Sequence, residues 1–346
     1  MTAGRYDHYD EDDVRVRPSR RGSRPRSKDR PAHEDAIDGR IIGVDRGRYQ
    51  VLVDGAMVTA MKSRNLGRKS IVVGDSVGLV GDVSGDRDTM ARIVRQNPRT
   101  SVLRRTADDT DPVERVIVAN ADQLVIVTAL ANPEPRPRMI DRCLVAAYDA
   151  GLTPILLLTK SDLVSPDELL SQYGDLDVEV LVTTIAEGGA GTAHQHGIEA
   201  VREVLRGKVS VFVGHSGVGK STLVNALVPD ASRSTGVVNV VTGRGRHTSS
   251  SAIALPLPDD DGWVIDTPGV RSFGLAHVDL ERIIDHFPEL AAGTDNCPRS
   301  CSHDEADCGL DEFVAVEAER QPHLKQRLDS LRRLLRSRSG DEEHPD

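Results

Sequence analysis

The sequence predicts three successive folded modules: a small β-barrel, a central α/β domain with a parallel sheet, and a C-terminal helical module around a metal site. Three observations lead to this fold class. Short β-like runs crowd residues 37–102, buried apolar runs alternate with helix-like segments over 103–275, and three of the four cysteines fall within residues 297–308. A chain of 346 residues has room for two or three domains.

The composition is typical of a soluble globular chain, with 38% hydrophobic and 28% charged residues. No apolar run approaches the roughly 20 residues that a membrane-spanning helix needs, and the charged N-terminus lacks the apolar core of a signal peptide. We therefore expect a cytoplasmic protein with no membrane partner. The net charge of −10 hides an arginine-rich stretch at residues 15–30, so the acidic balance does not exclude a nucleic-acid partner.

Residues 1–36 are rich in Arg, Asp, Pro and Ser and show no hydrophobic periodicity. They predict a disordered charged extension, which could be a solubilising tail or an arm that contacts RNA. Residues 339–346 predict a short disordered tail.

Five short β-like runs come after the extension, at residues 39–44, 49–54, 57–61, 76–80 and 90–94. Five strands in some 65 residues predict a barrel of the OB type, and such barrels often bind oligonucleotides. A barrel that serves only protein contacts is the alternative.

The central domain alternates apolar strands with amphipathic helices. The predicted strands are residues 123–127, 154–158, 178–182, 209–213 and 263–265, and helices are expected at 138–150 and 197–205. Continuous apolar strands of this kind are typical of a parallel sheet covered on both faces, and the alternation favours a doubly wound fold.

A phosphate-binding loop with the pattern G-x-x-x-x-G-K-S follows the strand at 209–213 and precedes a helix-like run. Its glycines allow backbone N–H groups to surround phosphates, and the helix N-terminus favours their negative charge. The lysine can reach the β- and γ-phosphates, and the serine hydroxyl can bind Mg²⁺. The predicted nucleotide contacts here are Gly214, His215, Ser216, Gly217, Val218, Gly219, Lys220, Ser221 and Thr222.

The strand at 263–265 ends in D-x-x-G, which places Asp266 and Gly269 where an Asp holds the Mg²⁺ water shell and a Gly N–H senses a γ-phosphate. A second element, Thr159-Lys160-Ser161-Asp162, ends the strand at 154–158. A buried carboxylate at Asp162 would accept hydrogen bonds from guanine N1–H and its amino group, which adenine cannot offer. The next strand ends in Thr183 and Thr184, candidates for further contacts to the base.

The order of these elements is unusual, because the guanine-reading residues 159–162 precede the phosphate loop. This order predicts a circularly permuted GTPase domain. It also connects the loop at 266–269 directly to the C-terminal module, so we hypothesise that a switch ordered by the γ-phosphate moves that module.

The cysteine cluster supplies the four ligands Cys297, Cys301, His303 and Cys308. A Cys₃His set suits tetrahedral Zn²⁺ with no open position, which indicates one structural zinc ion. A single long helix is expected over 311–338. Cys143, alone on a predicted helix, is best explained as a small buried apolar residue.

The predicted fold class is therefore multidomain α/β. It comprises an N-terminal OB-type β-barrel at 37–102, a central circularly permuted P-loop GTPase domain at 103–275, and a C-terminal helical zinc-binding domain at 276–338. This arrangement, with the motifs above and the segments 119–123, 245–248 and 266–274, resembles the RsgA (YjeQ) family of GTPases. The resemblance implies a GTPase with Mg²⁺ and zinc that binds the small ribosomal subunit and its rRNA, hydrolyses GTP when the subunit stimulates it, and acts in late maturation. We expect a monomer.

Catalysis is the least determined part. Val270 stands where many GTPases carry a glutamine that orients water, and the family resemblance implies His247 as the substitute. His247 could equally contact rRNA or be merely exposed. Thr248 is the expected Mg²⁺ ligand of switch I, although the adjacent serines 249–251 leave its register open. Two other functions remain open: an RNA-binding scaffold with GTP as a regulatory ligand, and a permuted GTPase of large-subunit assembly.

Overall fold

The computed structural model describes residues 33–67, 70–86, 88–106, 114–173, 178–185, 195–228, 252–267, 273, 283–317, 319–321 and 324–339. Residues 35–346 belong to one compact unit. Within the described ranges, none of the helices combines the length and the apolar character needed to cross a membrane. The predicted domain limits and the predicted terminal extensions stay predictions.

A closed five-stranded barrel begins the described chain. Its strands are β1 (Ile37–Asp45), β2 (Arg48–Val53), β3 (Ala56–Lys62), β4 (Ser76–Val80) and β5 (Ala91–Gln96). The pairing runs β1–β2–β3–β5–β4 and returns from β4 to β1, with only β3–β5 parallel. Alternate residues such as Ile41, Val51 and Ile93 point into an apolar interior. The predicted OB-type barrel is confirmed.

The central sheet has the order β10-β9-β8-β13-β15-β14. Its strands are β8 (Gln123–Ala129), β9 (Thr153–Thr159), β10 (Glu179–Val182), β13 (Lys208–Val213), β15 (Gly262–Asp266) and β14 (Ile253–Pro256). All of these pairings are parallel except β14–β15. The five predicted parallel strands are confirmed. The sheet also contains β14, which was not predicted because a strand of four residues carries too short a pattern.

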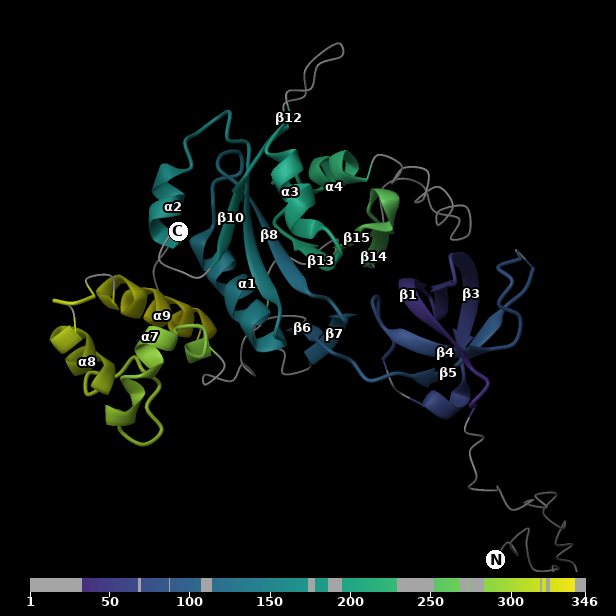
Figure 1. Ribbon diagram of the computed structural model, residues 1–346, viewed down its shortest axis with the longest axis horizontal. Helices are drawn as coiled ribbons and strands as arrows, with labels where there is room; N and C mark the ends of the chain where they lie inside the picture. The colour runs from purple at the N-terminus through teal and green to yellow at the C-terminus, as the bar shows by residue number, and fades with distance from the viewer. Residues whose placement is uncertain are drawn as a thin grey trace, which may run out of the picture. The chain divides into compact units, whose positions relative to one another are not determined.

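Helices cover both faces of this sheet (Figure 1). The helices are α1 (Pro137–Ala150), α2 (Asp167–Tyr173), α3 (Ile198–Leu205) and α4 (Lys220–Leu227). Along β8, Leu124 and Ile126 join the apolar cluster that contains α1, whereas Val125 and Val127 join the cluster that contains α3 and α4. The strand is apolar throughout because each face meets a helix layer.

In the described residues, the barrel pairs with the central sheet through β1 and is also bridged to a separate two-stranded hairpin. β1 pairs with β14 at Gly43 and Ile253, and Val73 forms a bridge with Val118 of β7 (Glu114–Ala119), which forms a hairpin with β6 (Val102–Thr106). Gly74 lies so close to β7 that a Cβ atom there would be 1.9 Å from the Ala119 carbonyl oxygen. A side chain at this position is therefore excluded.

The C-terminal module contains α7 (Pro288–Ala291), α8 (Gly309–Glu317) and α9 (Leu324–Ser339). The prediction of one long helix over 311–338 is wrong, because the chain forms two helices there. Pro322 stands between them in the sequence, and a proline lacks the N–H that a continuous helix needs and disfavours helical geometry in the residue before it.

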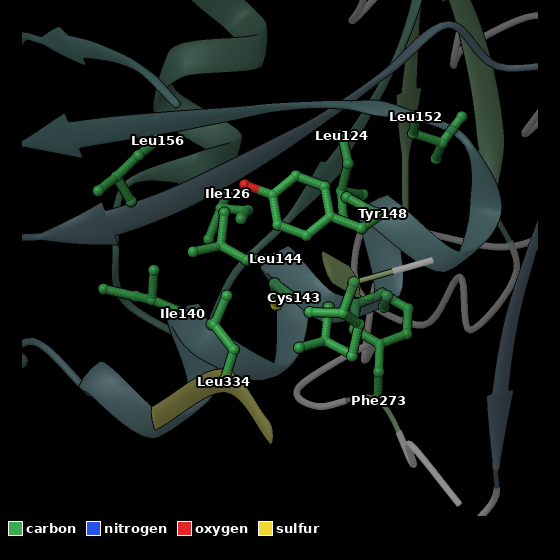
Figure 2. Packing of buried hydrophobic residues seen from close by; sticks show 14 of the residues in the cluster. Leu124, Ile126, Ile140, Cys143, Leu144, Tyr148, Leu152, Leu156, Phe273 and Leu334 are labelled. Atoms are coloured by element: carbon green, nitrogen blue, oxygen red, sulfur yellow. The ribbon is translucent and has the colours of Figure 1, made fainter. Parts of the chain in front are cut away.

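The last helix is buried against the central domain. α9 packs on α1, and Leu334 of α9 lies beside Ile140 and Cys143 of α1 (Figure 2). The side chain of Cys143 is 1% exposed, which confirms its prediction as a buried apolar residue. Two short strands complete the fold, β11 (Thr184–Ile185) and β12 (Gln195–His196).

Candidate nucleotide-binding site and metal centre

The site lies where the strand order of the sheet reverses. From β8 the chain proceeds through β9 and β10 toward one side, and from β13 it proceeds to β15 on the other side. In doubly wound sheets, ligands bind in the crevice outside the carboxyl ends of the strands at such a point. The loops that leave β8, β9, β13 and β15 here carry three of the predicted motifs.

The phosphate loop between β13 and α4 depends on its glycines. Gly217 and Gly219 have φ angles of 86° and 92°, a region that other residues rarely adopt. Gly214 lies so close to β8 that a Cβ atom would be 2.6 Å from the carbonyl oxygen of Val127. Because α4 begins at Lys220 directly after the loop, the N-terminal N–H groups of the helix face the same crevice.

The loop at residues 159–162 is bound to the phosphate loop. The hydroxyl of Thr159 donates to the carbonyl of Val218 at 2.6 Å, and the ammonium of Lys160 donates to the carbonyl of Gly217 at 2.9 Å. On the other side, the amide of Ser161 donates to the carbonyl of Thr183 at 3.3 Å. These hydrogen bonds therefore hold together three loops that are distant in sequence.

Asp162 is exposed at the end of this loop, and its burial against a bound base stays a prediction. It comes after β9 at the open edge of the sheet, where protein atoms do not cover it. The dry environment that discrimination between bases requires would have to come from the bound base itself.

A charged pair joins the start of α4 to the end of β15. The Nζ atom of Lys220 lies 2.5 Å from Oδ1 of Asp266, and their side chains are only 12% and 23% exposed. The next residue, Thr267, is fixed because its hydroxyl donates to the carbonyl of Phe212 in β13 at 2.7 Å. A phosphate that carries a divalent cation matches this pair, because the ammonium can bind the phosphate and the carboxylate the cation.

The cysteine cluster is a second site, remote in sequence from the first. The ligand atoms of Cys297, Cys301, His303 and Cys308 all lie within 4.8 Å of one another. The Cys297 sulfur lies 3.6 Å from Nδ1 of His303 and 3.9 Å from the Cys308 sulfur. Sulfurs bound at about 2.3 Å to a tetrahedral Zn²⁺ would be about 3.8 Å apart, so the side chains fit this ion.

Comparison with known proteins decides the family. The model of the RsgA GTPase family matches residues 96–276. A curated protein of Pseudomonas putida named "Small ribosomal subunit biogenesis GTPase RsgA" is 39% identical over 258 residues, which cover 72% of this chain and 71% of that one. The chain belongs to the RsgA GTPase family.

Other RsgA relatives extend the match. The protein of the same name from Chlorobaculum parvum is 36% identical over 286 residues, covering 79% of this chain and 89% of that one. The crystal structure of YjeQ from Thermotoga maritima aligns with a TM-score of 0.60 at 27% identity, over 86% of this chain and 98% of that chain. The structure of YloQ, a circularly permuted GTPase, shares the fold at 21% identity with a TM-score of 0.59.

The structure brings most of the predicted RsgA site residues together, but not all lie in its described part. Residues of the phosphate loop, Thr159–Asp162, Thr183, Thr184, Asp266 and the four metal-site side chains are described. His247, Thr248 and Gly269 lie outside the described residues. One neighbour was missed: the carbonyl of Asn132, in the loop after β8, accepts a hydrogen bond from Lys160. Asn132 could have been predicted as a site residue, because it follows β8, the strand next to β13, at the carboxyl end of the sheet.

Proposed function

We propose that this RsgA-family protein is a GTPase of small-subunit biogenesis that binds the small ribosomal subunit and its rRNA. The chain is a GTP hydrolase by its family. The meeting of the phosphate loop, the 159–162 loop and the Lys220–Asp266 pair at one switch point carries the proposal. Names of the curated relatives supply the subunit as the partner.

In the proposed complex, the phosphates lie on the loop at residues 214–222 and the base lies against the 159–162 loop. Lys220 leaves Asp266 to bind the β- and γ-phosphates, which frees the carboxylate for the Mg²⁺ shell. Asp162 accepts the two guanine donors, and Thr183 and Thr184 border the base. Ser221 and Thr248 are the proposed direct Mg²⁺ ligands, and the Gly269 N–H contacts the γ-phosphate.

Hydrolysis is proposed to be slow until the subunit binds. Val270 has no group that could orient a water molecule. We propose His247 for this step, since an imidazole can orient water or accept its proton. Full subunit-stimulated hydrolysis by His247→Ala would remove His247 from the mechanism.

The proposal also covers the setting of the protein. We propose one Zn²⁺ bound by Cys297, Cys301, His303 and Cys308. Its role is structural, because four protein ligands leave no open coordination position for catalysis. We propose a cytoplasmic monomer that exchanges GTP and GDP and has no membrane partner.

The test is phosphate release from GTP with and without purified small subunits, with large subunits as the matched control. We expect stimulation by small subunits alone, and a loss of about 10²–10³ in the stimulated rate for Lys220→Ala, which removes a charge that stabilises the transferred phosphoryl group. Stimulation by large subunits alone would instead indicate that the protein acts in large-subunit assembly. Binding to small subunits without stimulated release would make it an RNA-binding scaffold.

A further inference from the structure

Two adjacent residues in α1, Asp141 and Arg142, bind two segments that are distant from each other in sequence. α1 packs on strands β8 and β9 of the sheet and also on the C-terminal helix α9 (Figure 1). No nucleotide contact is proposed for either residue, yet both are held by specific polar contacts.

Arg142 holds the segment that comes after the D-x-x-G motif. Its Nε atom donates to the carbonyl of Phe273 at 2.8 Å. The ring of Phe273 is 1% exposed and packs in the apolar cluster of Leu144 and Tyr148 (Figure 2). Four residues earlier in the sequence stands Gly269.

The two described residues on either side of positions 268–272 are each held by a hydrogen bond. Thr267 is hydrogen-bonded to β13, and Phe273 is bound to α1. A guanidinium that donates to a carbonyl forms a stronger hydrogen bond than a neutral donor does. The end point of the segment is therefore well defined by Arg142.

Asp141 connects the same turn of α1 to the C-terminal module. Its side chain is 2% exposed, and Oδ2 lies 3.1 Å from Nε of Arg333 in α9. The Arg333 guanidinium also lies 4.9 Å from the ring centre of Tyr173, at the end of α2. Buried ion pairs add little net stability, but they can select one register of packing.

We propose that Arg142 is the positioning residue for the D-x-x-G segment, and that Asp141 couples it to the docking of α9 through Arg333. Contacts of this segment with a γ-phosphate then depend on α9. Because a coupling free energy between two sites is reciprocal, binding of a γ-phosphate must favour the docked position of α9 by the same amount as docking of α9 favours binding of the γ-phosphate. A partner that grips the C-terminal module thereby changes how the site holds GTP relative to GDP. The inference rests on the proposed nucleotide site.

The test compares affinities for GDP and a non-hydrolysable GTP analogue by fluorescent nucleotide titration of the full chain. Only the analogue carries a γ-phosphate. We expect Arg142→Met to leave GDP affinity unchanged and to weaken the analogue about tenfold, the loss expected for one charged hydrogen bond. Arg142→Lys keeps a charged donor and should recover part of the loss. Arg136→Met, at an exposed position just before the same helix, is the control.

Arg333→Met tests the coupling to α9. It should weaken the analogue selectively, and its effect should not add to that of Arg142→Met. The role of Arg142 would be overturned if the affinities for GDP and the analogue fell equally. It would also be overturned if the ratio of the two affinities were unchanged in Arg142→Met and Arg142→Lys. The coupling would be overturned if Arg333→Met left the ratio of the GDP and analogue affinities unchanged. It would also be overturned if the effects of Arg333→Met and Arg142→Met on analogue affinity were strictly additive. Failure of the unaltered chain to bind either nucleotide would instead refute the nucleotide site itself.

Discussion

Removing Arg332 should weaken zinc binding although Arg332 is not a ligand. Its Nε atom donates to the carbonyl of His303 at 3.0 Å, and its two terminal nitrogens donate to the carboxylate of Asp311 at 2.9 and 2.7 Å. One planar side chain from α9 therefore fixes the ligand loop at His303 and again just after Cys308. Three thiolates around Zn²⁺ also leave one net negative charge, which the guanidinium offsets.

The size of the effect is set by this geometry. Loss of a group that orients metal ligands typically costs 10–100-fold in metal affinity, or about 1.4–2.8 kcal/mol. Arg332 is 16% exposed but its partner Asp311 is 49% exposed, so the part-buried hydrogen bond to His303 carries most of the effect, and we expect Arg332→Met to fall in that range. Arg336 is the matched control from the same helix. It is 48% exposed and binds the carboxylate of Asp304, which is not a zinc ligand, so Arg336→Met should cost at most about threefold.

The assay is competition for zinc between the full chain and a colorimetric chelator of known affinity. Arg332→Lys separates charge from geometry, because a lysine keeps the charge but cannot bind His303 and Asp311 together. It should retain less zinc than the unaltered chain and more than Arg332→Met. Unaltered zinc affinity in Arg332→Met, or equal losses in the Arg332 and Arg336 variants, would refute the reasoning.

Three further predictions concern single side chains. Asp162→Asn should lower GTP affinity about 100-fold in fluorescent nucleotide titrations, since it removes an acceptor of two charge-assisted hydrogen bonds; unchanged affinity would exclude Asp162 as the base reader. Asp75→Asn should lower the free energy of unfolding in urea by about 3 kcal/mol, because it breaks the buried ion pair with Arg99; a loss below about 1 kcal/mol would contradict this. Burial raises the pKa of Cys143 to about 12, so at about pH 8 its thiol stays protonated. Mass spectrometry should find it unlabelled by thiol reagents until the chain unfolds, and rapid labelling of the folded chain would contradict this.

The central sheet was predictable because its signals are local. A strand such as β8, buried on both faces, must be apolar at nearly every position, and that pattern is visible in the sequence. The glycines of the phosphate loop are equally local, since Gly217 and Gly219 are required by their own backbone angles. The break between α8 and α9 could have been predicted from Pro322. It was missed because the apolar residues before and after Pro322 all fit the spacing of one continuous helix.

The unpredicted features depend on pairings between distant residues. Asp75 of the barrel and Arg99 of the following segment are polar residues with no local pattern, and only the closed barrel brings them together. The pairing of β1 with β14 joins residues some two hundred positions apart, and a strand of four residues carries too little periodicity to be recognised. The hydrogen bond from Arg142 to Phe273 has the same character.

In the permuted order the chain after β15 leads toward the C-terminal module, so we expect that module to respond to the nucleotide. Thr159 and Lys160 bind the phosphate loop through carbonyls of Val218 and Gly217, and such contacts need neighbouring strand ends, whatever the order of the chain. The chain order decides only which segment comes after β15. Here the chain after β15 leads to Phe273, which is bound by Arg142 of α1, and then to the C-terminal module, so we expect a rearrangement at a γ-phosphate to be transmitted toward α9. The alternative would show itself simply: small-angle scattering profiles that are identical with GDP and with a GTP analogue would mean that this connection transmits no large movement.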